Sequence, residues 1–126
     1  MTLEHILLID DEPDIREVTQ IVLESVGGLR VTCASRGQEG LELAWRSQPD
    51  LILLDVMMPG MSGLEVIEQL RQDPRSAETP VVFMTAKVQQ REIDSYLAAG
   101  AKGVIVKPFD PLQLVDEVRR LAGEEA

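Results

Sequence analysis

The sequence predicts an α/β fold in which a doubly wound, five-stranded parallel sheet carries helices on both faces. Short apolar runs alternate with helical apolar patterns about five times along 126 residues, as in sheets with right-handed crossovers. Hydrophobic residues make up 44% of the chain and aromatic residues 3%, which favours aliphatic helices packed on a buried sheet over a β-sandwich. The length suits a single domain, which we expect to span residues 1–126.

In the first half of the chain, the apolar run His5–Ile9 predicts a buried strand. The proline at position 13 favours the start of a helix, and the two glycines at 27–28 would end it. The apolar residues expected to face the core from this helix are Ile15, Val18, Ile21, Val22 and Val26. Residues 30–34 alternate polar and apolar side chains, which indicates a half-exposed strand at a sheet edge, and residues 37–47 form a short helix.

The second half repeats the pattern of strand and helix three times. Its expected elements are the strands Leu51–Leu54, Val81–Met84 and Val104–Val106 and the helices that start near Gly63, Gln89 and Asp110. The first of these strands is a wholly apolar run that leads into Asp55. Pro59 and Gly60 then break the chain into a turn, so Asp55 stands at a strand-to-loop junction, where open α/β sheets bind ligands.

Polar residues stand just past the buried strands: Asp10 and Asp11, then Asp55, then Thr85, then Lys107. Because parallel strands share one carboxyl edge, these side chains can converge. Crowded carboxylates repel one another unless a cation lies among them, and an all-oxygen ligand set favours Mg²⁺ over Zn²⁺. Such a site suits a phosphoryl group, and a carboxylate such as Asp55 can itself be the nucleophile in phosphoryl transfer.

Four motifs carry a resemblance to a known family: Leu8–Glu12, Asp55–Gly63, Met84–Ala86 and Lys107–Phe109. With them in this order, the chain resembles the receiver domain of two-component response regulators nearly from end to end. The resemblance implies the flavodoxin-like strand order 2-1-3-4-5. It also implies that Asp55 accepts a phosphoryl group from a sensor histidine kinase or a phosphotransfer protein, and that the domain catalyses only its own phosphorylation and dephosphorylation.

The resemblance also implies the other residues of the site. Mg²⁺ would be held by Asp10, Asp11, Asp55 and the backbone carbonyl of Met57, and the phosphoryl oxygens would contact Thr85 and Lys107. Glu12 matches no site position and is left out. A cis peptide bond is expected between Lys107 and Pro108.

One position departs from the family pattern. Three residues before Lys107 the family often carries an inward-turning Tyr or Phe, and this chain has Val104. We therefore expect a shift of the loop after Thr85 and of the following helix, rather than rotation of a ring, to carry the signal. The output surface would consist of residues 89–99, 104–106 and 110–121, and it would bind a downstream protein.

Composition limits the partners. The chain has 12 Lys and Arg against 22 Asp and Glu, a net charge of −10, which makes direct binding of nucleic acid or an anionic membrane unfavourable. The single Cys33 can form no internal disulfide, and the sequence shows neither a membrane span nor a signal peptide. These features lead us to expect a cytoplasmic protein that is a monomer or a weak dimer.

Three alternatives stay open at this point. A flavodoxin-like cofactor binder shares the fold class, although two acids in the first loop would repel the cofactor's phosphate. A phosphatase of the haloacid dehalogenase type also uses Asp, Thr, Lys and Mg²⁺, but it needs a second Asp where this chain has Met57. A degenerate receiver that only scaffolds partners is the third alternative, and it is disfavoured because all five site residues are present.

Overall fold

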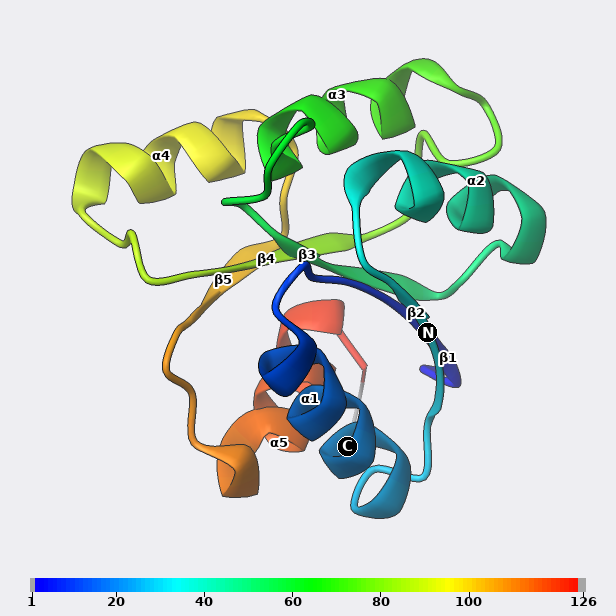
Figure 1. Ribbon diagram of the computed structural model, residues 1–126, viewed down its shortest axis with the longest axis vertical. Helices are drawn as coiled ribbons and strands as arrows, with labels where there is room; N and C mark the ends of the chain where they lie inside the picture. Colours follow the sequence, from blue (N-terminus) through cyan, green and yellow to red (C-terminus); the bar gives the residue numbers. More distant parts are fainter. Residues whose placement is uncertain (1, 125–126) are drawn as a thin grey trace.

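The computed structural model describes residues 2–124, and their strands and helices alternate along the chain (Figure 1). The strands are β1 (His5–Ile9), β2 (Arg30–Ala34), β3 (Leu51–Asp55), β4 (Val81–Thr85) and β5 (Gly103–Val106). The helices are α1 (Pro13–Ser25), α2 (Gly37–Ser47), α3 (Gly63–Gln72), α4 (Gln90–Ala98) and α5 (Pro111–Ala122). Each predicted element is found close to its predicted ends. Within residues 2–124, no helix has the length and apolar character needed to cross a membrane.

The strands form one parallel sheet in the order β2-β1-β3-β4-β5, which confirms the order implied by the family resemblance. The inner strands β1, β3 and β4 are buried along their whole length. Strand β2 lies at one edge, as its alternating pattern predicted, and β5 lies at the other. Helices α2, α3 and α4 cover one face of the sheet, and α1 and α5 cover the other (Figure 1).

Successive residues of the inner strands enter opposite cores. From β3, Ile52 and Leu54 pack under α2, α3 and α4, whereas Leu51 and Leu53 pack against α1 and α5. Both faces are therefore covered, which is why these strands read as continuous apolar runs rather than as alternating ones. The packing holds the strand ends, and the polar residues that follow them, at one rigid edge.

Helix α1 turns to the core a face that only partly matches the predicted one: Ile15 and Val22 pack against the core, as predicted. Three residues of the predicted stripe are exposed: Val18 by 42%, Ile21 by 52% and Val26 by 69%. The buried residues are Thr19 and Leu23. The Thr19 hydroxyl donates to the carbonyl of Ile15 at 2.6 Å, so its polar group is satisfied within the helix and the residue can be buried. The predicted stripe was wrong for the three exposed residues.

Candidate functional site

The carboxyl edge of the sheet brings together the polar residues that the sequence predicted. Asp10, Asp55 and Thr85 are almost completely buried at the ends of β1, β3 and β4. One carboxylate oxygen from each of Asp10, Asp11, Glu12 and Asp55 lies within 4.8 Å of the others. Such crowding of like charges is unfavourable without a compensating cation, so this cluster is the strongest candidate for a functional site.

Lys107 supplies a positive charge to the cluster. Its Nζ lies 2.8 Å from Asp10 Oδ2, 3.1 Å from Glu12 Oε1 and 3.5 Å from Asp55 Oδ1, and its side chain is only 10% exposed. Burial alone would lower the pKa of Lys107, but the hydrogen bond and charge of Asp10 and the neighbouring acids outweigh it and raise the pKa. The ammonium therefore stays charged. The Lys107–Pro108 peptide bond is cis, as predicted.

Glu12 is part of the cluster although sequence reasoning left it out. Its carboxylate reaches Lys107 from the rim, where its side chain is 58% exposed. The signal that could have found it was its position directly after two acids at the same sheet edge. That signal was ambiguous, because an acid just before Pro13 also suits the first turn of a helix.

Asp55 has the most strongly perturbed carboxyl group of the cluster. Burial first, and then the charge of Asp10, raise the pKa of Asp55 to about 7, against the opposite pull of Lys107. The backbone N–H of Met57 donates to Asp55 Oδ1 at 3.3 Å, which orients the carboxylate. A carboxyl group with a pKa near neutral and a fixed orientation is typical of functional sites.

Two buried carboxylate oxygens of the cluster, Asp11 Oδ1 and Asp55 Oδ2, have no hydrogen-bond partner among the described residues. A buried acceptor without a partner is costly, and these two belong to acids whose carboxylates converge. The convergent group consists of carboxylates alone, a donor set that favours Mg²⁺ over Zn²⁺. The residues present therefore fit a divalent cation.

The loop from β3 to α3 fixes the position of Asp55. Ser62 caps α3 through a reciprocal capping box with Glu65, and the N–H of Gly63 donates to the carbonyl of Val56 at 2.9 Å. A Cβ on Gly63 would collide with the carbonyl oxygen of Asp55 and lie 2.9 Å from the Val56 Cα. This close approach of backbone to backbone requires glycine.

Thr85 is linked to α4 through two further hydrogen bonds. Its Oγ1 accepts from the N–H of Lys87 at 3.0 Å, and the hydroxyl of Tyr96 donates to the carbonyl of Lys87 at 3.0 Å. Tyr96 is buried, and its ring centroid lies 5.2 Å from that of Phe83 on β4. These two hydrogen bonds connect Thr85 through Lys87 to Tyr96 on α4. Sequence reasoning did not identify this connection.

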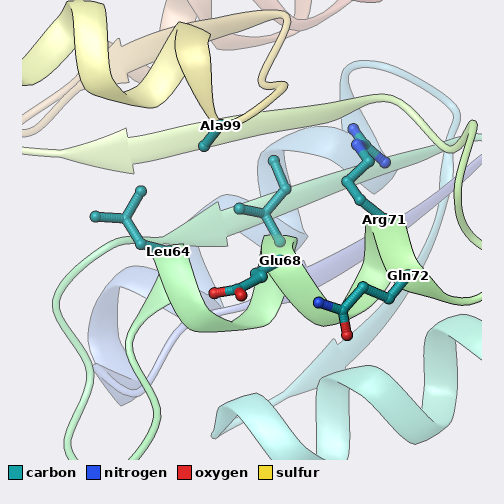
Figure 2. Close-up of a pocket in the computed structure, with 6 residues that line it drawn as sticks. Leu64, Glu68, Arg71, Gln72 and Ala99 are labelled. Carbon is teal, nitrogen blue, oxygen red and sulfur yellow. The ribbon is translucent and has the colours of Figure 1, made fainter.

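A groove of about 500 Å³, lined by none of the acids of the cluster, lies along α3 and near the end of α4 (Figure 2). Its lining residues are Leu64, Ile67, Glu68, Arg71, Gln72 and Ala99. The Arg71 guanidinium donates to the carbonyls of Ser76, Thr79 and Gly100 at 2.8–3.2 Å, so it braces the fold. The described residues that line the groove form no converging set of reactive groups, in contrast to the acids at the carboxyl edge of the sheet.

The chain was compared with known proteins and solved structures. The family model of the response regulator receiver domain matches residues 6–119. The DNA-binding dual master transcriptional regulator RpaA of Synechocystis is 40% identical over 93% of this chain. The chain spans about half the length of that relative, 48%.

Solved structures give the same result. Chemotaxis protein CheY4 of Vibrio cholerae superimposes with a TM-score of 0.88 at 31% identity, over 95% of this chain and 99% of that one. The receiver domain of the sensor histidine kinase PA1611 of Pseudomonas aeruginosa, with a magnesium ion coordinated in its active-site cleft, gives a TM-score of 0.85 at 28% identity, over 98% of this chain and 100% of that one. Sequence, fold and the acidic cluster agree, and the chain belongs to the response regulator receiver domain family of two-component signalling systems.

Proposed function

We propose that residues 1–126 act as a receiver that accepts a phosphoryl group on Asp55 from a phosphohistidine of a sensor kinase or a phosphotransfer protein. The observation that carries this proposal is the Asp55 carboxylate itself, 3% exposed, with Oδ1 held by a backbone N–H and Oδ2 without a partner among the described residues. Family membership argues against the flavin-binding and phosphatase alternatives.

We assign the cation to Asp10, Asp11, Asp55 and the backbone carbonyl of Met57. Bound there, Mg²⁺ would neutralise carboxylate charge and polarise phosphoryl oxygens. The orphaned oxygens of Asp11 and Asp55 support this assignment, as does the magnesium ion coordinated in the active-site cleft of the PA1611 receiver domain.

The transfer itself would be carried by this chain's own groups. An oxygen of Asp55 attacks the phosphorus, the P–N bond of the phosphohistidine breaks, and its electron pair returns to the imidazole nitrogen. Lys107, 3.5 Å from Asp55, would pair with a phosphoryl oxygen, and the Thr85 hydroxyl would donate to another. The protein modifies only itself, so it is a signalling domain rather than an enzyme that turns over external substrate.

Asp55→Asn tests the proposal. Acetyl phosphate with Mg²⁺ is expected to add one phosphoryl group to the unchanged protein and none to Asp55→Asn, because the carboxamide lacks the nucleophilic oxygen. Intact-protein mass spectrometry measures the adduct. Asp116→Asn, which removes an exposed acid on α5, is the matched control and should be phosphorylated normally. The same adduct on Asp55→Asn would refute the assignment.

We further propose that the signal leaves through the surface formed by residues 89–99, 104–106 and 110–121, which would bind a downstream protein. Three apolar side chains support this choice: Leu97 is 47% exposed, Val106 47% and Leu112 88%. They lie on α4, on the edge strand β5 and on α5. Exposed apolar side chains around a sheet edge favour contacts with another protein.

Tyr96→Phe tests this route. A phosphoryl group that draws Thr85 inward would pull on Lys87 and, through its carbonyl, on the Tyr96 hydroxyl. Hydrogen exchange with and without beryllofluoride is expected to change over residues 86–99, and Tyr96→Phe should at least halve the change within α4. Val104→Tyr should alter partner affinity and leave Asp55 phosphorylation intact.

Ser95→Ala is the matched control for this experiment, because its hydroxyl donates to the Glu92 carbonyl of the same helix. It should behave as the unchanged protein does. Exchange changes confined to the loops at Asp10 and Asp55 would rule out this output surface.

A further inference from the structure

The Glu12 side chain does not cap the helix, although Glu12 occupies the capping position. Glu12 is the N-cap residue of α1, yet its carboxylate makes no cap hydrogen bond. Capping positions favour Ser, Thr, Asp or Asn, whose short side chains reach the helix amides. The Glu12 carboxylate instead bonds to Lys107 Nζ at 3.1 Å.

The Lys107 ammonium is shared unequally among the acids. Its two shorter contacts go to Asp10 at 2.8 Å and Glu12 at 3.1 Å, whereas Asp55 is 3.5 Å away. The Lys107 side chain is 10% exposed and that of Glu12 is 58% exposed. The ammonium therefore lies on the Asp10 and Glu12 side of the cluster, farther from the carboxylate that we propose as the phosphoryl acceptor.

The backbone of Glu12 acts on the same cluster. Its N–H donates to Asp10 Oδ1 at 2.9 Å while Asp10 Oδ2 accepts from Lys107. Both oxygens of Asp10 are thus oriented by groups that belong to or bind Glu12. Glu12 is outside the ligand set proposed for Mg²⁺. Its ion pair with Lys107 would therefore persist when Asp10 binds the cation.

We propose that Glu12 is a positioning residue that keeps the Lys107 ammonium from settling between Asp10 and Asp55, so that Lys107 leaves room there for the cation and does not block Asp55 before phosphoryl transfer. This inference rests on the proposed function and names a residue that regulates the same site. Without the Glu12 carboxylate, the ammonium would settle deeper between Asp10 and Asp55. A cation would then have to displace it.

Calorimetric titration with Mg²⁺ tests this inference, because it measures binding and not phosphorylation. Glu12→Gln is expected to weaken Mg²⁺ binding about fivefold to tenfold, through loss of a nearby charge and through competition from the released Lys107. In a Lys107→Met background only the charge effect remains, so Glu12→Gln should weaken binding no more than about twofold. This non-additivity is the signature of action through Lys107.

Glu12→Asp separates charge from reach. It keeps the negative charge and suits the N-cap position, but its side chain is one methylene shorter and should not hold Lys107. We expect it to weaken Mg²⁺ binding about threefold when Lys107 is present and not measurably in the Lys107→Met background. Glu17→Gln, an exposed acid on the same helix, controls for net charge and should leave affinity unchanged.

The outcomes are distinguishable. An unchanged protein that binds no Mg²⁺ would refute the proposed metal site. Normal binding with an equal effect of Glu12→Gln in both Lys107 backgrounds would overturn the positioning role and leave the proposed function standing. Circular dichroism of each variant verifies the fold, and the single substitution Glu12→Asp keeps the test decisive if the double variant does not fold.

Discussion

Metal-free protein carrying Asp55→Asn is expected to have a free energy of unfolding roughly 2–4 kcal/mol above that of the unchanged protein at pH 7.5. The cause is the buried charge of Asp55, whose pKa is raised from 3.8 to about 7 by burial and by Asp10. Asparagine has nearly the same shape and no charge. Its amide also brings a donor close to Asp11, whose Oδ1 has no partner among the described residues.

The stability gained through Asp55→Asn should increase as the pH rises. Unfolded Asp55 releases its proton near pH 3.8 and folded Asp55 near 7, so the unfolded state loses the proton first. The unchanged protein therefore loses stability relative to Asp55→Asn as the pH rises from about 4 to 7. The difference should be small at about pH 4 and complete above about pH 7.

Urea unfolding in the presence of a chelator, at several pH values across this range, measures the difference. Asp116→Asn removes an exposed acid on α5 and is expected to change stability by no more than about 0.5 kcal/mol at every pH. If Asp55→Asn gave the same difference at pH 4 and at pH 7.5, the charge of Asp55 would not be its source.

The fold was predictable because the inner strands are buried on both faces. Continuous apolar runs as short as Leu51–Leu54 are typical of buried parallel strands, and each of these runs leads into a polar residue at the edge of the sheet. Parallel strands place those ends at one edge, so Asp10, Asp55 and Thr85 could be brought together from sequence order alone. Strand order β2-β1-β3-β4-β5 required the resemblance, because alternation of strands and helices is compatible with several orders.

The parts that were missed depend on contacts between distant residues. The bond between Glu12 and Lys107 joins positions 95 residues apart. Which of three acids lies nearest to the Lys107 ammonium depends on distances in the folded protein that no local sequence pattern encodes. Helix α1 carries apolar residues around much of its surface, and packing against the sheet selected the face that contains Thr19 and Leu23 together with the predicted Ile15 and Val22. Spacing alone could not decide which face would be buried.

Lys107→Met is expected to lower the free energy of unfolding of the metal-free protein by about 2–4 kcal/mol at pH 7.5. Methionine keeps much of the length of the side chain but leaves the buried Asp10 and Asp55 without the ammonium that lies 2.8 and 3.5 Å from them. Adding Asp55→Asn to this variant should recover most of the loss, because the crowded charge is then reduced. Equal stability of Lys107→Met and the unchanged protein would mean that the ion pairs contribute nothing.

Addition of Mg²⁺ should narrow the difference in stability between Lys107→Met and the unchanged protein. A ligand present at a hundred times its dissociation constant stabilises the folded state by about 2.7 kcal/mol. Lys107→Met should gain more than the unchanged protein does, since its crowded carboxylates have no compensating ammonium until the cation binds. Asp11→Ala removes a proposed ligand and should lose most of the gain. Thermal unfolding with and without Mg²⁺ measures the gain in the unchanged protein, in Lys107→Met and in Asp11→Ala. If Mg²⁺ did not change the melting temperature of the unchanged protein, the proposed metal site would be wrong. A cation that binds the two carboxylate oxygens without partners among the described residues should stabilise the folded state measurably.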